Sequence, residues 1–447
     1  MNEDGFIRNL GDGLVLRRAT LADVERLAEF NARVHSDAGW DTPEMRVGAW
    51  VRDLMTKPHP TFTTGDFLIV EDVATSAVVS STNLISQTWS YAGIEFGMGR
   101  PELVGTHPDY RKRGLVRAQF EVLHRWSAER GHKMQAITGI PNYYRQFGYE
   151  MAVDLHGGPS GPLTSVPQLK EDTAETYAVR PAEPSDVEFI VEVQAHAAKR
   201  HVLSCARDAA LWRYELDGRT PGGASALWLC IIERADGEPV GFLAHPEFLW
   251  GDSLALWTYE LKPGVSWWEV TPCVMRYLKA KGTDYPPYIE RENQKPFERL
   301  VLVLGSEHPC YEIVAEWLPR MRKPYSWYVR VPDLPGFLQY IAPVLEARLA
   351  HSVMVGYSGE LKLNFYRDGV KMTFEKGRIT DVVPWESPVS EAKSVEFPDL
   401  TFLQLLFGYR SFAELEAAYT DCGARHEMRL LLNALFPKQA SAVWPVS

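Results

Sequence analysis

The chain has 447 residues, of which 45% are hydrophobic and 23% are charged. This length exceeds what one hydrophobic core usually serves, so roughly two to four domains are expected, and the composition excludes a disordered chain. The net charge of −11 at pH 7 argues against general affinity for nucleic acid. No run of residues reaches the length of a membrane span, and the acidic N-terminus lacks the apolar stretch of a secretion signal. We therefore expect a cytoplasmic protein.

Cysteine usage supports the same expectation. The five cysteines lie far apart and form no closely spaced pair: Cys205, Cys230, Cys273, Cys310 and Cys422. Their odd number and their spacing argue against a disulfide framework and against a zinc site. We expect a reducing environment and no bound metal.

Two short stretches, residues 16–25 and 179–188, resemble each other. Arg, Ala, Asp, Val and Glu recur in them at a constant offset, so we predict that one structural unit occurs twice. Each copy is typical of a strand, a turn and a helix that carries carboxylates in its first turn. A strand pair follows each copy, at 66–71 and 77–84 in the first and at 227–233 and 239–244 in the second.

The rest of the chain divides by composition and period. Residues 156–176 are rich in Gly, Pro, Ser and Thr and predict a linker. From about residue 325 the pattern predicts a helix over 337–349, alternating strands at 361–365 and 370–374, and helices at 401–409, 411–419 and 425–436. This is the pattern of a third, α+β domain.

The leading candidate site begins with a short strand at 102–106. Arg111, Lys112, Arg113 and Gly114 follow it, and a helix begins directly after them. A strand that leads into a helix N-terminus offers free backbone amides and a favourable dipole to an anion, and Arg and Lys pair with phosphate oxygens. An isolated basic turn is often only solvated surface. The position of this turn in an otherwise acidic chain favours a pyrophosphate site.

This segment resembles the R/Q-x-x-G-x-G/A signature of the GNAT acetyltransferase superfamily. Arg111 and Gly114 match the signature, and Val116 stands where Gly or Ala is usual. The run R-K-R-G-L-V-R, together with Y-Y-R-Q-F-G-Y at 143–149, is similar to the Eis-like (enhanced intracellular survival) type. The resemblance covers essentially the whole chain.

The resemblance implies a mixed α/β and α+β fold, with tandem GNAT domains whose central sheets are flanked by helices. It implies a catalytic GNAT domain at 1–156, a linker at 157–176 and a degenerate second GNAT domain at 177–323. A sterol-carrier-protein-like α+β domain with a C-terminal tail would occupy 324–447. It also implies assembly into a homo-oligomer.

The implied activity is transfer of an acetyl group from acetyl-CoA to a small-molecule or peptide amine. Backbone groups around Val104 and Thr106 would pair with the pantetheine arm of CoA. The pyrophosphate would be held by the basic turn and the start of the helix: Arg111, Lys112, Arg113, Gly114, Leu115 and Val116. The matching place in the second copy, 261–270, has one lysine and no basic turn, so we expect it not to bind CoA.

Two further residues carry chemistry in this interpretation. Tyr144 aligns with the family's general-acid tyrosine, and a phenol with a pKa near ~10 suits protonation of a thiolate. In Eis-like enzymes the base is the terminal carboxylate of the chain, here that of Ser447. Glu102 or Glu95 is the next candidate base.

The acceptor is expected beside an aromatic and acidic loop that contains His35, Asp37, Trp40, Asp41 and Glu44, which suits a cationic amine. A solvated loop with one buried Trp is the alternative. Two other functions stay open at this point. The protein would be a lipid-binding or acyl-CoA-binding protein, or a regulatory protein without catalysis.

Overall fold

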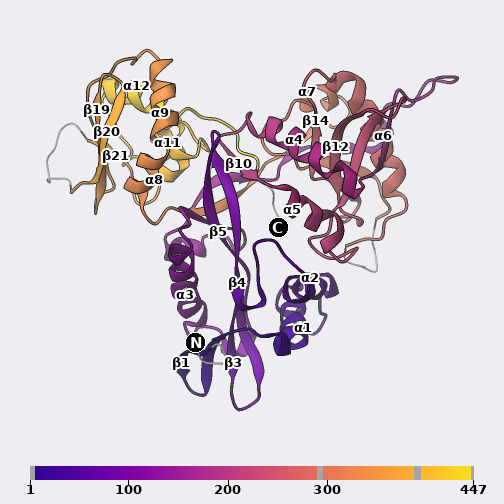
Figure 1. The fold of residues 1–447 in the computed structure, drawn as a ribbon, viewed down its shortest axis with the longest axis horizontal. Coiled ribbons are helices and arrows are strands. Elements are labelled where there is room, and N and C mark those ends of the chain that lie inside the picture. Colours follow the sequence, from indigo (N-terminus) through magenta and orange to yellow (C-terminus); the bar gives the residue numbers. More distant parts are fainter. Residues whose placement is uncertain (1–5, 289–294, 387–393, 444–447) are drawn as a thin grey trace.

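The structure is a computed structural model and describes residues 6–288, 295–386 and 394–443. Three bodies follow one another along the chain, and the first contains both long strands at the centre of Figure 1. Within the described residues, no helix combines the length and the apolar character needed to cross a membrane.

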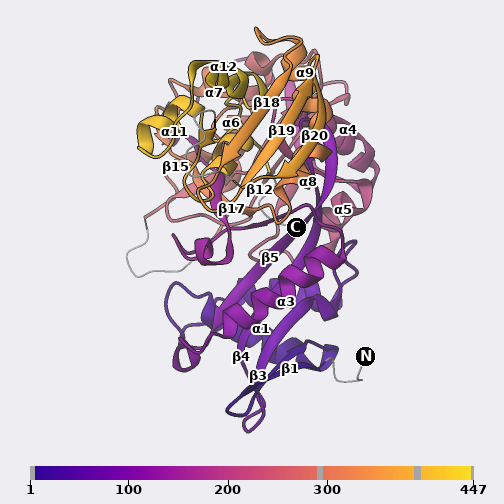
Figure 2. The ribbon, with the colours of Figure 1, turned by 90° about the vertical axis from the view of Figure 1, so that its left-hand side faces the viewer.

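The first unit is built on a large mixed sheet in the order β1-β2-β3-β4-β5-β6-β17-β7. Successive side chains of a strand point to opposite faces. Phe67 and Ile69 of β3 therefore join the core under α1 and α2, whereas Leu68 and Val70 join the core under α3. Figure 2 shows α3 lying across the long strands. The elements are β1 (Phe6–Gly11), β2 (Leu14–Arg18), α1 (Val24–Val34), α2 (Met45–Thr56), β3 (Phe67–Asp72), β4 (Ala77–Tyr91), β5 (Ile94–Thr106), α3 (Leu115–Glu129), β6 (Met134–Ile137) and β7 (Glu150–Leu155).

The second unit repeats this plan with a smaller sheet. Its order β9-β11-β12-β14 corresponds to β2-β3-β4-β5 of the first unit. The strand that corresponds to β5 is broken at Trp257 into β13 and β14. The elements are β9 (Tyr177–Pro181), α4 (Val187–Ala198), β10 (Leu203–Ala206), α5 (Ala209–Arg213), β11 (Trp228–Arg234), β12 (Pro239–His245), β13 (Ser253–Leu256), β14 (Thr258–Leu261), α6 (Trp267–Gly282), β15 (Arg299–Leu302), α7 (Tyr311–Val314) and β16 (Arg320–Arg322).

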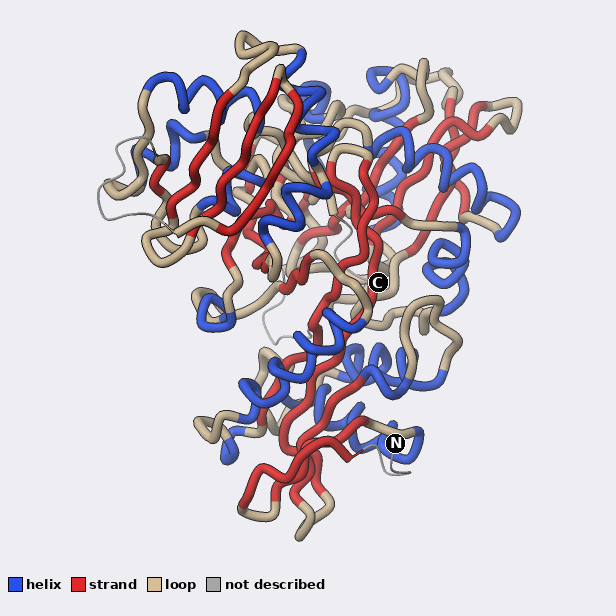
Figure 3. The backbone as a smooth tube through the Cα atoms, turned by 60° about the vertical axis from the view of Figure 1, so that its left-hand side comes forward, coloured by secondary structure: helices blue, strands red, loops and turns tan. Residues whose placement is uncertain are grey.

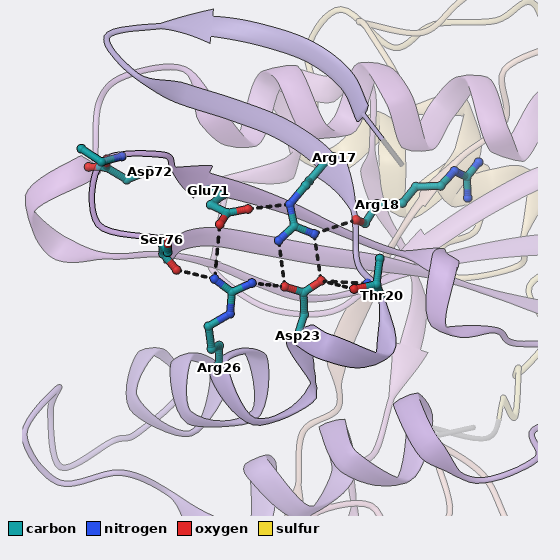
Figure 4. A network of polar contacts seen from close by, with 9 residues as sticks. Arg17, Arg18, Thr20, Asp23, Arg26, Glu71, Asp72 and Ser76 are labelled. Carbon is teal, nitrogen blue, oxygen red and sulfur yellow. Dashed lines mark hydrogen bonds and ion pairs between the residues drawn. The ribbon is translucent and has the colours of Figure 1, made fainter. Parts of the chain in front are cut away.

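The repeated sequence stretches form the same polar network in both units. In the first, Arg17 donates two hydrogen bonds of 2.8 Å to Asp23 and one of 2.6 Å to Glu71 (Figure 4). In the second, Arg180 donates bonds of 2.7 and 2.9 Å to Asp186 and one of 2.7 Å to a carboxylate of β11. Arg17 on β2 and Arg180 on β9 each tie their strand to the turn before the helix that follows it. The repeat that the sequence predicts is therefore also present in the structure.

The two units exchange a strand. β8 (Gly158–Pro162) follows the last strand of the first unit but lies between β15 and β16 of the second. β17 (Tyr325–Arg330) follows the second unit but lies between β6 and β7 of the first. Part of the segment predicted as a linker at 157–176 is thus a buried strand, and the segment predicted to open the third domain at 324 completes the first sheet.

The C-terminal region is α+β, as its sequence pattern predicts. Its sheet has the order β20-β19-β18-β21 and is covered by helices (Figure 3). The helix expected over 337–349 is broken at Ile341, because Pro343 in the first turn of α9 lacks an N–H and starts a new helix. The elements are α8 (Leu334–Tyr340), α9 (Ala342–Ala350), β18 (Gly359–Asn364), β19 (Gly369–Glu375), β20 (Arg378–Pro384), β21 (Val395–Glu396), α10 (Phe402–Leu406), α11 (Phe412–Ala418) and α12 (His426–Leu435).

Candidate active site

The centre of the first unit opens where β5 and β6 separate. These parallel strands pair only at Met98 with Met134 and at Gly99 with Gln135. Beyond that point β5 runs on for seven residues to Thr106 beside β4 alone. One backbone edge of β5 therefore faces an opening, and an extended ligand can hydrogen-bond to such an edge.

A β-bulge shapes this edge. The register between β4 and β5 shifts between Ser81 and Asn83, and Leu103 opposite them has φ +52. Ser80 donates to the Gly105 carbonyl at 2.8 Å, and Thr82 donates to the Glu102 carbonyl at 3.2 Å. Buried hydroxyls of β4 thus hold the bulged strand in place.

These hydroxyls were missed by the sequence reasoning. Ser80, Ser81, Thr82 and Asn83 are fully buried in a strand that was expected from its apolar neighbours. Buried polar groups need hydrogen-bond partners, and the side-chain oxygen of Gln119 of α3 lies 2.9 Å from the Ser80 hydroxyl as an alternative acceptor to the Gly105 carbonyl. Four consecutive polar residues inside a predicted core strand were the available signal.

The basic turn lies at one end of the opening. Lys112 and Gly114 both have left-handed backbone conformations, with φ +65 and +74, and Gly114 caps α3. Left-handed residues of this kind occur in turns whose backbone N–H groups form anion-binding concavities. Arg111, Lys112 and Arg113 are exposed and form no ion pair with any described carboxylate. The turn thus presents unpaired positive charge at a helix N-terminus.

Tyr144 lies at the other end of the opening, at the start of the short helix η4 (Tyr144–Phe147). Its ring stacks on Phe120 at 5.8 Å and meets Tyr328 of the exchanged strand β17 edge-on at 5.5 Å. Burial, and next the charge of Glu102, raise the pKa of the Tyr144 phenol well above its ordinary value. The phenol is therefore protonated across the physiological range.

All these features surround one cavity of about 870 Å³. Every residue that the sequence predicted to hold CoA lines it, as does Tyr144: Val104, Thr106, Arg111, Lys112, Arg113, Gly114, Leu115 and Val116. The half-buried Val116 packs with Tyr144 and Phe120, so its extra bulk forms part of the cavity wall. Arg117 also lines the cavity and donates to Gln146 at 3.0 Å.

Only part of the predicted acceptor loop lines the cavity. His35 and Asp37 line the cavity, whereas Trp40 packs against Phe30 and His107, and Glu44 caps α2. Asp41 is exposed and does not line the cavity. The acidic and aromatic character expected for the whole loop is thus limited to its first residues.

The two alternative bases differ in position. Glu102 lines the cavity and accepts from Arg100 at 2.8 Å, and the guanidinium of Arg100 lies 4.9 Å from the centre of the Trp327 ring. Glu95 is exposed near the start of β5 and lies outside the cavity. Ser447 lies outside the described residues, which end at Val443.

The family comparison agrees with this geometry. Residues 15–152 match the model described as an acetyltransferase (GNAT) domain. This chain contains a GNAT domain. The match ends just after the start of β7, so the GNAT domain includes the bulged β5, the basic turn and Tyr144. The GNAT fold supports acyl transfer, and GNAT domains use acetyl-CoA as a co-substrate.

Solved structures match over nearly the whole chain. A protein of unknown function from Enterococcus faecalis V583, described as a probable N-acyltransferase, has a TM-score of 0.66 at 11% identity, with 97% of this chain and 100% of that chain covered. A GCN5-related N-acetyltransferase from Kribbella flavida has a TM-score of 0.64 at 17% identity, with 97% and 98% covered. Eis1 from Mycobacterium abscessus has a TM-score of 0.55 at 14% identity, with 96% and 98% covered. At these identities the likeness is one of fold. No curated protein matches the sequence.

Proposed function

We propose that this protein is an N-acetyltransferase that moves an acetyl group from acetyl-CoA to a primary amine by direct attack. The observation that carries the proposal is the single cavity in which an open β5 edge, an unpaired basic turn and a buried tyrosine meet. A pantetheine arm needs an extended backbone partner, and a pyrophosphate needs amides and cations at a helix N-terminus. The GNAT domain offers the open edge of β5 as the extended partner, and directly after it along the chain the basic turn at the N-terminus of α3.

The residues around the cavity divide the reaction between them. The amine nitrogen attacks the thioester carbonyl carbon, the carbon–sulfur bond breaks, and the departing thiolate takes a proton from the Tyr144 hydroxyl. The amine loses a proton to a base. Burial keeps the Tyr144 phenol protonated and so able to donate, while the same rise in pKa makes it a weaker acid than a free tyrosine. Asp37 at the cavity wall adds a negative charge that favours a cationic acceptor.

We assign the base to the terminal carboxylate of Ser447. The path of the last described residues supports this assignment. Ala442 forms a parallel bridge with Ser204 of β10, and β10 pairs with residues 88–91 of β4, the strand beside which β5 bulges. The four residues that follow Val443 can span about 14 Å when extended. Glu102 is a weaker candidate because its carboxylate already pairs with Arg100.

The proposal is tested by thiol release from acetyl-CoA with a panel of amines, polyamines, aminoglycosides and lysine peptides. We expect turnover with at least one primary amine. Adding three residues after Ser447 moves the carboxylate and is expected to abolish turnover, whereas Glu102→Gln retains it. Turnover that survives the extension and is lost in Glu102→Gln would assign the base to Glu102. A protein that neither binds CoA nor acetylates any amine is not an acetyltransferase.

The domain limits form a second part of the proposal. We propose a catalytic GNAT domain at 1–156, a second GNAT unit without CoA binding at 177–323 and a sterol-carrier-like region at 324–447. The repeated Arg–Asp network and strand order support the second unit. Its loop at Lys262–Val265 has one cation, and that lysine is paired with Glu238. Equilibrium binding of CoA with a stoichiometry of two per chain would contradict this assignment.

A further inference from the structure

A second cleft, lined mainly by the second unit and also by Asp154 and His156 of the first, lies in the corresponding position of the second unit. The active-site cavity is lined by the end of α1 and by the residues after β6; the second is lined by the end of α4 and by the residues after β15. Tyr311 begins α7 just as Tyr144 begins η4, and its hydroxyl donates to the Gly305 carbonyl at 2.8 Å. The second cleft is much smaller, at about 90 Å³. It is thus a reduced counterpart of the first.

The chain's own C-terminal segment forms one wall of this second cleft. Ser441, Ala442 and Val443 line it, together with residues of α4 and β14. Val202 donates to the Ala440 carbonyl at 2.9 Å, and Ala442 donates to the Leu203 carbonyl at 2.9 Å. The segment is therefore bound as an extended strand beside β10, by main-chain hydrogen bonds.

Side chains of the second unit complete the contact. Gln439 donates to the Arg200 carbonyl at 3.3 Å. Burial lowers the pKa of His201, which lines the same cleft, to about 4, so its imidazole is neutral at pH 7. Ser441 is 5% exposed. The segment is thus held by neutral polar contacts on the side where the GNAT domain has its α1–α2 loop.

The cleft also retains unused polar groups. Buried atoms without a described partner are the Trp257 Nε1, His156 Nε2, His201 Nδ1 and Ser441 Oγ atoms, and all four residues line the same cleft. Buried polar atoms usually have partners. Their convergence beside the segment marks this cleft as a polar recognition site rather than as apolar core.

The same strand connects the segment to the catalytic sheet. β10 pairs with the end of β4, from Leu203 opposite Tyr91 to Ala206 opposite Thr88. Figure 1 shows β10 beside the upper end of the long strands of the first unit. The C-terminal segment is therefore fixed to the second unit and, through β10, to the sheet that forms the active-site cavity.

We infer that the cleft of the second unit is a binding site for the chain's own C-terminal segment, residues 439–443, and that this attachment positions the end of the chain for the reaction in the first unit. Where the first unit has its proposed CoA cavity, the second unit binds an extended peptide segment instead. The catalytic consequence rests on the proposed function, whereas the binding site itself does not.

The test uses the full chain with Ala442→Pro, which removes the N–H that donates to Leu203. The matched control is Val443→Pro, because the Val443 amide has no backbone acceptor among the described residues. Hydrogen exchange is followed in the peptide that contains Val202 and Leu203. Loss of one or two main-chain bonds, worth about 1.4 kcal/mol, raises the exchange rate about tenfold in Ala442→Pro. The control leaves it unchanged.

A second variant approaches the contact from the other side. His201→Ala removes an imidazole that lines the cleft beside Ser441 and Ala442, and it is expected to raise exchange in the same peptide. Unchanged exchange in both Ala442→Pro and His201→Ala overturns the binding site. Raised exchange together with a fall in kcat of about tenfold, at unchanged CoA affinity, supports both the site and its positioning role.

The two proposals fail in different ways. Raised exchange with full turnover overturns the positioning role and leaves the binding site standing. If extension beyond Ser447 still abolishes turnover in that case, the terminal carboxylate stays the base and reaches the cavity without the second unit. If extension has no effect, the assignment of the base fails and the binding site is untouched.

Discussion

The hydroxyl of Tyr144 lies against the backbone of Gly139, so that a Cβ atom on this glycine would sit 3.4 Å from the phenol oxygen and 3.3 Å from the ring. Gly139 also has φ +137, a conformation that other residues rarely adopt. The loop after β6 therefore fixes where the phenol points. The second unit differs, because the Tyr311 hydroxyl donates to the Gly305 carbonyl at 2.8 Å and a Cβ atom on Gly305 would meet no atom of Tyr311 within 4 Å.

Gly139→Ala is expected to lower kcat about 10- to 100-fold, because even a small displacement of an acid group is costly to catalysis. CoA affinity should stay within about twofold, since the basic turn is untouched. Single-turnover kinetics and equilibrium CoA binding measure the two effects separately. Tyr144→Phe serves as the reference variant, and a Gly139→Ala protein that is as active as wild type while Tyr144→Phe is inactive would contradict this role of the loop.

The pH profile gives a second prediction for Tyr144. Because burial raises the pKa of this phenol, the phenol stays protonated as the pH rises to about 10, the ordinary pKa of a tyrosine. We expect kcat to show no alkaline decrease from this group below that pH. A decrease centred near pH 8 that disappears in Tyr144→Phe would mean that the phenol ionises much more easily than its burial implies.

The basic turn supports a prediction about affinity. Arg111→Ala combined with Arg113→Ala is expected to weaken CoA binding by about 2 kcal/mol, or roughly 30-fold, because each removes a charge-assisted contact to pyrophosphate. The remaining affinity should depend less on salt concentration. Arg125→Ala is the matched control, since this exposed arginine of α3 lies outside the cavity and faces Glu129 at 3.8 Å. An equal loss of CoA affinity in the double variant and in Arg125→Ala would rule out a specific role for the turn.

Sequence reasoning reached the parts of the fold that are local in the chain. Arg17 and Asp23 lie close in sequence and recur as Arg180 and Asp186, so the repeat was visible. The basic turn was visible for the same reason. Strand exchange was hidden, because β8 and β17 pair with strands from other parts of the chain and no short-range period records that pairing.

The bulge in β5 was equally hidden from sequence. It depends on Leu103 taking a positive φ, which is uncommon for a leucine. Tertiary bonds from β4 make this conformation stable, and they join residues about twenty positions apart. The basic turn and Tyr144, which line one cavity, could therefore be singled out from the sequence, whereas the geometry between them comes from packing.

The repeated ion pairs give a matched stability prediction. Burial alone would raise the pKa of Asp23, but hydrogen bonds from Arg17 and Thr20 outweigh it and hold the pKa well below its usual range. Asp23→Asn leaves the Arg17 charge poorly compensated in a buried place, and we expect a loss of about 3 kcal/mol at pH 7. The corresponding Asp186→Asn should cost less, about 1 kcal/mol, because Arg180 is more exposed and better screened.

The sign of the pH dependence follows from the lowered pKa. A depressed folded-state pKa contributes stability above the unfolded value of about 4, and this contribution is lost as the pH falls toward the folded-state value. The difference between wild type and Asp23→Asn in urea unfolding should therefore shrink as the pH falls below about 4. A difference that is constant from pH 7 to pH 3 would show that the carboxylate charge is not the source of the stability.

The contact between β5 and α1 provides a prediction that links stability to the cavity. A Cβ atom on Gly105 would lie 2.5 Å from Val34 Cγ1, so Gly105→Ala must push the end of α1 away from the bulged strand. Overpacking of this kind costs about 1 to 3 kcal/mol. Both residues line the cavity, so CoA affinity should fall as well.

Val34→Ala removes the clashing methyl groups and costs little by itself, because Val34 is only half-buried. In the double variant the two changes should compensate, with a coupling of about 1 to 2 kcal/mol in urea unfolding and recovery of most of the CoA affinity. Strict additivity would mean that α1 and β5 do not touch in solution as they do here. Recovery of stability without recovery of CoA affinity would mean instead that the alanine at position 105 obstructs the β5 edge itself, which would place the pantetheine arm directly against that residue.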